Sequence, residues 1–278
     1  MNLYDQHLHS KHSFDSDAQP ADNARKAIEV GLAGLTFTEH YDTHPDEIAE
    51  CVYDDAAYSA TIDALRDEFG TRLRIGKGIE VCYQPDNMPR IIDFLDHLRF
   101  DLVLLSVHWF YGQPIHAGHV WKGRDPSKVT RRYLEAVLDA VRFCERLHRD
   151  RPRVFDVLGH LDFVKRYSHR YAGGVFVAQH SDVMDEILRT CLAADLIPEI
   201  NTSTLRRGGL DETMPGPAVV QRYADLGGTM MSIGSDSHSP RDIGADLDHA
   251  VNMLRDAGIN QLAVFEDRTR WPEPIDDR

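Results

Sequence analysis

Apolar and polar positions alternate along this chain on two length scales. Short, almost fully apolar segments have the length and composition of buried strands, and the longer amphipathic segments between them have the spacing of helices. The predicted strands are residues 2–9, 33–40, 73–81, 100–108, 153–160, 196–203 and 228–238. The predicted helices are residues 20–30, 56–69, 88–98, 126–149, 181–194, 217–226 and 240–257. Seven strand-then-helix units predict an α/β fold in which βα units surround a parallel sheet.

The chain length fits one continuous α/β barrel, so we treat residues 1–278 as a single domain. After the seventh predicted helix, the apolar stretch 261–265 is either an eighth strand or a packed tail. From about residue 268 we expect the chain end to fray.

Nearly every predicted strand ends in a side chain that can bind a metal or a phosphate. His7 and His9 occupy alternate positions of one strand, which points both imidazoles to the same side, and Asp236 and His238 repeat this spacing. Glu80 lies in an apolar strand, where a carboxylate is costly to bury without a cation or another partner. The candidate ligands are His7, His9, Asp15, His40, Glu80, His108, His160, Asp236 and His238. Because the carboxyl ends of barrel strands meet at one mouth, we expect these side chains to share a pocket.

Each ligand has a second interpretation when it is taken alone. His40, His108 and His160 are explained equally well as imidazoles that bond only to nearby backbone, and Asp15 as a residue that caps a turn. The whole set favours a metal site, because independent core histidines rarely fall at so many successive strand ends. Asp5 is expected to orient His7 or His9. Asp162 is expected to orient His160 in the same way. His12 is interpreted as a surface residue of the loop.

Composition narrows the class of protein. Apolar residues make up 42% and charged residues 27%, as in ordinary soluble domains. The net charge of −14 argues against non-specific electrostatic binding of nucleic-acid phosphates, and bound cations would neutralise part of it. We find no stretch that approaches the roughly 18 apolar residues of a membrane span, and no signal peptide, so we expect a cytoplasmic protein without a membrane partner. The four cysteines are scattered without a CxxC pair, which argues against a disulfide framework and a thiolate zinc site.

Imidazole and carboxylate ligands without cysteine favour Zn, Fe or Mn. Two or three such divalent ions would lower the pKa of bound water and clamp a phosphate, so the expected nucleophile is a metal-activated hydroxide. The sequence offers no convincing side-chain nucleophile. Between the fourth strand and its helix, the loop "WFYGQPIHAGHVW" (109–121) carries His116 and His119. This loop is either a lid over a small aromatic substrate or an Ω-loop packed for its own stability.

Taken in order, the motifs HxH, "TEH", an isolated Glu, "SVH", "GH.D" and "SDSH" resemble those of the polymerase-and-histidinol-phosphatase (PHP) family of phosphoesterases. "FDVLGHLDFVKRY" and "EINTSTLRRG" resemble the histidinol-phosphatase branch in particular. The resemblance runs from Asp5 to His238. It implies a distorted (β/α)7 TIM-like barrel with its metal site at the carboxyl ends of the strands. The implied activity is hydrolysis of L-histidinol phosphate in histidine biosynthesis.

The resemblance also implies three metal positions. The implied ligand sets are His7, His9, Glu80 and Asp236 for one ion; Glu80, His108 and His160 for a second; and Asp15, His40 and His238 for a third. Some family members have a histidine where Asp15 stands. Among residues outside the metal positions, Arg206 is the expected phosphate-binding residue, with Arg207 in reserve and Ser203 as a further substrate contact. The alternative for the two arginines is a solvated basic turn. Lys165 and Arg166 are weaker candidates that we interpret as surface residues. Glu80, Asp236, His238 and Arg206 are therefore the expected catalytic residues.

Three alternatives remain open. A PHP phosphatase or phosphodiesterase acting on another small phosphate ester or a short oligonucleotide would use the same ligands, although the net charge counts against a long nucleic acid. An amidohydrolase-like barrel also opens with HxH, but it usually needs a lysine on the fourth strand, which here ends in "SVH". A non-catalytic metal-binding protein would need neither Arg206 nor an open coordination position. The expected partner is a small phosphorylated molecule, and the sequence makes no prediction of oligomeric state.

Overall fold

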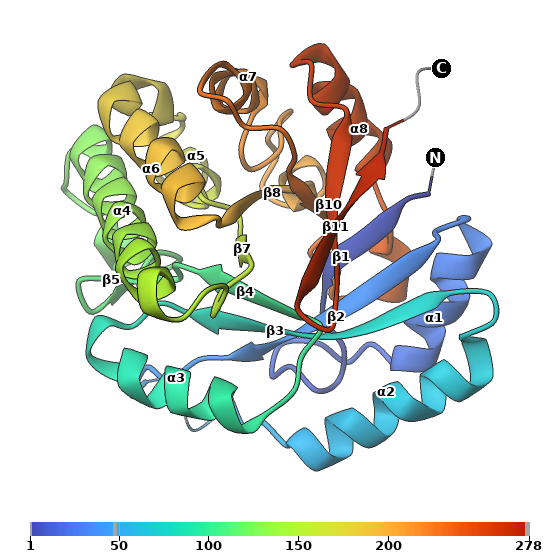
Figure 1. Cartoon of the computed structure of the whole chain (residues 1–278). Coiled ribbons are helices and arrows are strands. Elements are labelled where there is room, and N and C mark those ends of the chain that lie inside the picture. The colour runs from blue at the N-terminus through green and yellow to red at the C-terminus, as the bar shows by residue number, and fades with distance from the viewer. Residues whose placement is uncertain (1, 47–48, 50, 276–278) are drawn as a thin grey trace.

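Seven parallel strands form a distorted barrel, and helices pack around it (Figure 1). The computed structural model describes residues 2–46, 49 and 51–275. The sheet has the order β1-β2-β3-β4-β7-β8-β9. The strands are β1 (Tyr4–Leu8), β2 (Gly34–Tyr41), β3 (Arg74–Cys82), β4 (Leu102–Ser106), β7 (Val157–Leu158), β8 (Ile197–Asn201) and β9 (Ser232–Gly234). All seven predicted strands are present, and the expected α/β barrel is confirmed.

The barrel closes where β1 meets β9, but only near the carboxyl ends of these strands. The amide of His9 donates to the carbonyl oxygen of Ser237 at 2.8 Å, and the amide of Asp236 donates to the carbonyl oxygen of His7 at 2.7 Å. Below this point the carboxylate of Asp5 bridges the gap, because it accepts hydrogen bonds from the amide and hydroxyl of Ser235. Candidate ligands from the first and last strands are therefore held beside each other by backbone hydrogen bonds.

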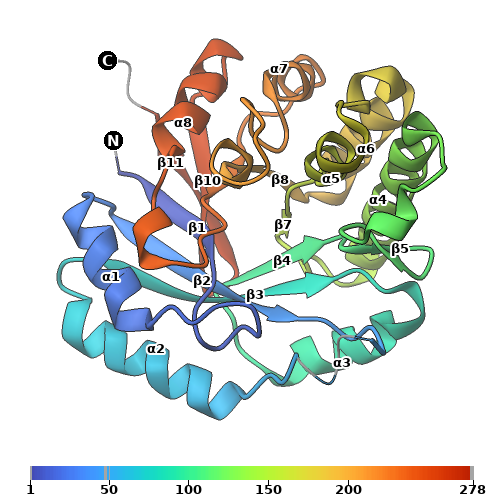
Figure 2. The same ribbon diagram turned by 180° about the vertical axis from the view of Figure 1, so that it is seen from behind.

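The helices lie outside the barrel, as the two opposite views show (Figures 1 and 2). They are α1 (Pro20–Glu29), α2 (Asp55–Phe69), α3 (Met88–His97), α4 (Pro126–Asp150), α5 (Val164–Ala172), α6 (Ser181–Ala194), α7 (Pro217–Asp225) and α8 (Leu247–Asp256). One apolar core joins side chains from Leu8 to Ile275. Within the described ranges, no helix is long and apolar enough to cross a membrane.

Two helix predictions differ from the structure. The predicted helix 240–257 is broken into a 3-10 turn, η5 (Pro240–Asp242), and α8, because Gly244 and Asp246 take positive φ angles of 70° and 60° between them. The pattern did not predict α5, which follows β7 closely and is rich in basic and aromatic residues.

The C-terminal segment forms a hairpin, so the prediction that the chain frays from about residue 268 is wrong for the described residues. Strand β10 (Gln261–Glu266) pairs antiparallel with β11 (Thr269–Pro274), outside the seven-stranded sheet. Ala263 and Phe265 pack against Leu102, Val157 and Ile197, the first residues of β4, β7 and β8. The hairpin therefore covers the end of the barrel where the strands begin and leaves the opposite end for the site.

Candidate metal centre

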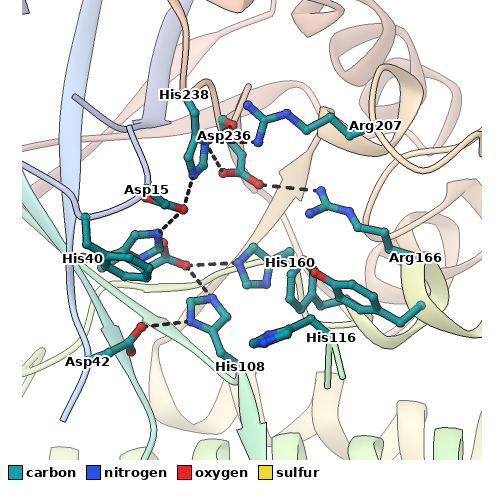
Figure 3. Close-up of a pocket in the computed structure, with 14 residues that line it drawn as sticks. Asp15, His40, Asp42, His108, His116, His160, Arg166, Arg207, Asp236 and His238 are labelled. Atoms are coloured by element: carbon teal, nitrogen blue, oxygen red, sulfur yellow. Dashed lines mark hydrogen bonds and ion pairs between the residues drawn. The ribbon is translucent and has the colours of Figure 1, made fainter. Parts of the chain in front are cut away.

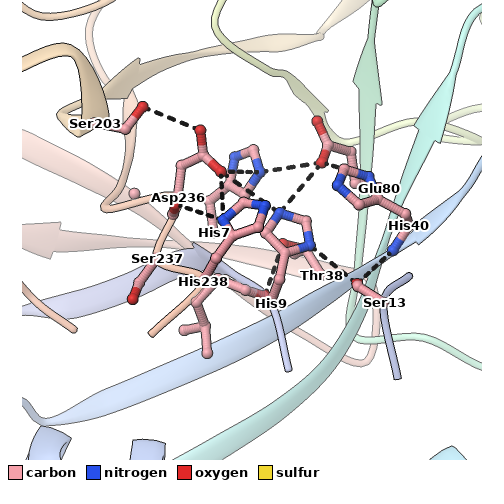
Figure 4. A network of polar contacts seen from close by, with 12 residues as sticks. His7, His9, Ser13, Thr38, His40, Glu80, Ser203, Asp236, Ser237 and His238 are labelled. Atoms are coloured by element: carbon pink, nitrogen blue, oxygen red, sulfur yellow. Dashed lines mark hydrogen bonds and ion pairs between the residues drawn. The ribbon is translucent and has the colours of Figure 1, made fainter. Parts of the chain in front are cut away.

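Glu80 lies within a buried cluster of imidazoles at the carboxyl ends of the strands (Figure 4). It is 1% exposed, and in the parallel ladder its Cα partner on β2 is His40. Its carboxylate oxygens lie 3.2 Å from His7 Nε2, 3.4 Å from His9 Nε2, 3.2 Å from His40 Nδ1, 3.3 Å from His108 Nε2 and 3.0 Å from His160 Nε2. Five imidazoles from four regions of the chain therefore meet one carboxylate.

Two further carboxylates complete the cluster. Asp236 Oδ1 lies 3.6 Å from His9 Nε2 and 3.5 Å from His238 Nδ1. Asp15 Oδ2 lies 2.9 Å from His238 Nε2 and 3.5 Å from His40 Nε2. All nine sequence-predicted ligand side chains thus lie in one cluster, although they are spread over more than 230 positions of the chain.

The donor atoms fit divalent cations. His9 Nε2 and His40 Nδ1 are buried without a hydrogen-bond partner, although both face the carboxylate of Glu80. Buried polar atoms are normally satisfied, so these two nitrogens mark positions where a cation would supply the missing partner. Among the described residues, five groups of three ligand atoms are close enough to hold an ion together. Four consist of the predicted ligands: His7, His9 and Asp236; His7, Glu80 and His160; His40, Glu80 and His108; and His9, His40 and His238. The fifth joins His108 to Asp42 and Cys82. Imidazole and carboxylate donors of this kind suit Zn, Fe or Mn.

Burial and neighbouring charges set the charge states within the cluster. Burial opposes ionisation of Glu80, but the imidazoles of His7 and His40 hold the pKa of its carboxyl well below the usual range. The pKa values of Asp15 and Asp236 are likewise lowered against the effect of burial, mainly by neighbouring imidazoles. Burial lowers the pKa of His9 well below its ordinary value, so this imidazole is neutral and can donate a lone pair.

Two buried carboxylates orient ligand histidines, and sequence reasoning missed both. Glu199 Oε1 lies 2.7 Å from His7 Nδ1, and Glu199 Oε2 accepts a hydrogen bond from the amide of His160 at 2.9 Å. Asp42 Oδ2 lies 3.5 Å from Nδ1 of His108. The signal for Glu199 was the same as for Glu80, namely a carboxylate inside an apolar strand.

The supports expected from sequence have other partners. Asp5 bonds to Ser235 and to the amide of Gly244, and it meets His7 only at the backbone amide, at 3.5 Å, so it does not orient the imidazole of His7. Asp162 lies 3.0 Å from the buried Nζ of Lys165 and does not brace His160. As expected, His12 lies outside the cluster, with Nε2 3.0 Å from the hydroxyl of Thr61.

Two arginines stand over the cluster, and only one of them was expected to contact substrate. Arg166 and Arg207 both line the pocket (Figure 3). The guanidinium of Arg166 packs over the ring of Phe163, with 4.8 Å between its Cζ and the ring centroid. Arg207 Nη1 lies 3.2 Å from His238 Nδ1. The segment after β8 therefore contributes one pocket arginine, and α5 contributes the other.

Arg206 and Ser203, the other expected substrate contacts, do not line the pocket. Arg206 donates hydrogen bonds to the carbonyl oxygen of Ser235 at 2.6 Å and to the carboxylate of Asp246 at 2.8 Å, and it does not line the pocket. The Ser203 side chain is fully buried and contacts Asp236 Oδ2 at 3.0 Å. The two terminal nitrogens of Arg206 and the hydroxyl of Ser203 bond to groups around the turn after β8, whereas Arg206 Nε has no hydrogen-bond partner among the described residues.

The pocket above the cluster has a volume of about 510 Å³. Its wall is aromatic, formed by Phe14, Phe163, Tyr167 and His116. Of the two histidines in the 109–121 loop, only His116 lines the pocket, whereas His119 Nε2 lies 2.8 Å from the side-chain oxygen of Gln113. The loop folds as a small hairpin, β5 (Trp109–Phe110) with β6 (Gln113–Pro114). It therefore both packs on itself and reaches the pocket.

Residues 5–203 match the PHP domain family, a stretch that includes every ligand of the cluster except Asp236 and His238. This chain belongs to the PHP domain family. The resemblance in its motifs is therefore confirmed, and the two ligands beyond the matched stretch lie at the barrel closure between β1 and β9.

Relatives of this PHP chain match it along nearly its whole length. The probable histidinol-phosphatase of Clostridium acetobutylicum is 29% identical over 271 residues, which cover 96% of this chain and 98% of the relative. The histidinol-phosphatase of Lactococcus lactis subsp. lactis is 28% identical, with 95% of each protein covered.

A solved structure shows the same fold. The crystal structure of histidinol phosphate phosphatase from Lactococcus lactis subsp. lactis, complexed with Zn, L-histidinol and phosphate, superimposes with a TM-score of 0.81. The sequences are 26% identical in this comparison, which covers 96% of this PHP chain and 98% of the other.

Proposed function

We propose that this protein is a metal-dependent phosphomonoester hydrolase that converts L-histidinol phosphate to L-histidinol and phosphate in histidine biosynthesis. The observation that carries the proposal is the position of three ionised carboxylates and four ligand imidazoles in the lining of a pocket that Arg166 and Arg207 also line, with His7 and His9 buried beneath. Relatives with this activity in their names match nearly the full length of the chain.

The cluster divides into ligand sets for two or three divalent ions. We assign His7, His9, Glu80 and Asp236 to one ion; Glu80, His108 and His160 to a second; and Asp15, His40 and His238 to a third. When bound, divalent ions activate water at neutral pH and offset the charge of a phosphoryl group. Glu80 has two carboxylate oxygens, and each faces different imidazoles, so it can bridge the first two sets.

The two arginines bind the part of the phosphoryl group that faces away from the cluster. A guanidinium can donate two parallel hydrogen bonds to phosphate oxygens, and such charge-assisted bonds are stronger than neutral ones. Arg207 stands beside His238, and Arg166 stands beside Asp236 at 3.8 Å. Because both cations border ligand side chains, an ester phosphate over the cluster lies within their reach.

The aromatic wall suits the rest of the substrate. Phe14 and Tyr167 are pocket-lining aromatic side chains against which an imidazole ring can pack, whereas the ring of Phe163 is covered by Arg166 and His160. Phe14 is 44% exposed, which is consistent with a position at the rim of the pocket. A pocket of this size accommodates one small molecule and not an extended polymer.

The test is a substrate panel with metal-loaded protein. Protein loaded separately with Zn, Mn or Fe is assayed for phosphate release from L-histidinol phosphate and from other phosphomonoesters, beside a phosphodiester and an amide. We expect the highest kcat/KM for L-histidinol phosphate and loss of this activity in Glu80→Gln. Cleavage of only the phosphodiester or the amide would contradict the proposal.

A further inference from the structure

Glu39 is a buried carboxylate that the catalytic proposal leaves without a role. It precedes His40 on β2, is fully buried, and makes no ion pair with lysine or arginine among the residues described. Its oxygens instead accept hydrogen bonds from the amide of Ser10 at 3.0 Å, the hydroxyl of Ser10 at 2.6 Å and the hydroxyl of Ser13 at 2.5 Å. A buried charge is costly, so three donors from one loop indicate a specific use for this carboxylate.

Ser13 connects Glu39 to two candidate ligands, His9 and His40, and Figure 4 shows its position beside these two. Its hydroxyl oxygen accepts a hydrogen bond from the amide of His40 at 3.0 Å and lies 3.2 Å from Nδ1 of His9. A serine hydroxyl has one hydrogen and two lone pairs. Because the hydrogen points to Glu39 and one lone pair is used by the His40 amide, the remaining lone pair accepts the proton on His9 Nδ1.

This arrangement determines which nitrogen of His9 faces the site. With its proton on Nδ1, the imidazole keeps a free lone pair on Nε2, the buried nitrogen that lacks a hydrogen-bond partner. Nε2 lies 3.4 Å from Glu80 and 3.6 Å from Asp236, as a ligand to a shared ion requires. His7 reaches the same state by a direct contact with Glu199, without an intervening serine.

We propose that Glu39 is a positioning residue for the metal centre, acting through Ser13 to orient His9 and to hold the loop that carries Asp15. The loop runs from His9 to Asp15, and Glu39 binds it at both Ser10 and Ser13. His9, His40 and Asp15, which come from two elements, are thereby held in one geometry. The inference rests on the metal centre of the proposed function, but not on its substrate.

The test measures metal binding and not turnover. Ser13→Ala removes the hydroxyl that joins Glu39 to His9 and leaves Glu39 bonded to Ser10. Glu39→Gln replaces the carboxylate, whose two oxygens both accept, by an amide that has only one accepting oxygen. Asp156→Asn is the matched control, since Asp156 is an equally buried carboxylate with an arginine partner outside the cluster. Metal-free proteins, whose folding is verified by circular dichroism, are titrated with Co²⁺ and with Zn²⁺ against a competing chelator, and the visible absorption of bound Co²⁺ is recorded.

We expect Ser13→Ala and Glu39→Gln to weaken the binding of at least one ion about 10- to 100-fold and to change the Co²⁺ absorption, as loss of an outer partner of a ligand histidine does. Asp156→Asn should match the wild type in both measurements. If Glu39→Gln does not fold, Ser13→Ala decides. If a folded Ser13→Ala variant shows the metal affinity and the Co²⁺ absorption of the wild type, the role of Glu39 is overturned but the metal centre is not. If the wild-type protein itself binds no ion, both the role of Glu39 and the proposed metal centre are overturned.

Discussion

The guanidinium of Arg166 lies 3.8 Å from the carboxylate of Asp236, a candidate metal ligand that follows β9. Arg166 also donates a hydrogen bond to Ser203, whose hydroxyl contacts the same carboxylate. The cation is therefore held beside the cluster before any substrate arrives. Preorganised charge of this kind costs no rearrangement when a phosphate binds.

Arg166→Ala is expected to lower kcat/KM for L-histidinol phosphate about 10- to 100-fold, mainly through KM, because it removes a hydrogen-bonding partner for a charged phosphate. Steady-state kinetics at fixed metal content measures the effect. Arg206→Ala is the matched control: its guanidinium bonds to backbone carbonyl oxygens, so we expect a lower melting temperature with little change in KM. A normal KM in Arg166→Ala would remove this residue from the substrate site.

Removal of metal with a chelator is expected to lower the melting temperature by about 5–15 °C, because ions that bind only the folded state stabilise it by roughly 3–4 kcal/mol at saturating concentration. Glu80→Gln should lose most of this metal-dependent shift and reduce phosphatase turnover more than about 100-fold. Thermal melts with and without chelator test both points. Glu29→Gln, at an exposed position on α1, should retain the wild-type shift; a full shift in Glu80→Gln would argue against its bridging role.

Glu199→Gln is expected to weaken metal binding about 10- to 100-fold, because His7 loses the anionic acceptor that fixes its proton on Nδ1. The fold should persist, since the amide oxygen of glutamine can still accept from the His160 amide. Chelator competition monitored by metal analysis measures the change. Glu186→Gln, on the surface of α6, serves as control, and equal affinities in the two variants would show that Glu199 does not orient His7.

Loss of the proton from the Asp156 carboxyl is expected to lower the free energy of unfolding as the pH rises from about 4 to 6. Burial raises the pKa of this carboxyl from 3.8 to about 6, despite the neighbouring Arg268. The folded state therefore holds the proton more tightly than the unfolded state. The resulting stabilisation is complete below pH 4 and is lost as the pH passes through 6, an effect on the order of 1–3 kcal/mol.

Urea unfolding of wild type and Asp156→Asn at pH 4.5 and pH 7 isolates this contribution. Subtraction of the two pH dependences cancels the titration of the site carboxylates, which are present in both proteins. The wild type should lose more unfolding free energy than the variant between these pH values. Identical pH dependences would show that Asp156 titrates as an ordinary carboxyl.

Much of the candidate site could be predicted because its signals are local. The i, i+2 spacing of His7 and His9 determines their common side on any strand, and a carboxylate in an apolar run such as Glu80 needs a partner wherever the strand lies. The same reasoning applied to the run 196–203 would have identified Glu199. Strand β11, which includes Trp271, was missed because its polar, proline-containing sequence resembles a chain end.

Which of the neighbouring arginines faces the pocket could not be predicted from residues close in the sequence. Arg206 and Arg207 are adjacent in sequence, yet one bonds to backbone near β9 and the other faces the pocket. The direction of each arginine side chain depends on the backbone of the turn after β8. It also depends on which carbonyl oxygens remain free to accept a hydrogen bond once the barrel has closed. Arg166 reaches the site only because α5 packs beside that turn, where its guanidinium meets Ser203.

The sequence by itself determined the strands, their order along the chain and the chemical type of ligand at each strand end, because periodicity and residue type act over a few positions. Only the tertiary structure decided which ligands share a carboxylate, which arginines face the pocket, and that Glu39 and Glu199 stand behind His9 and His7. These relationships depend on hydrogen bonds between residues far apart in the chain. Their partners become known only when the barrel closes.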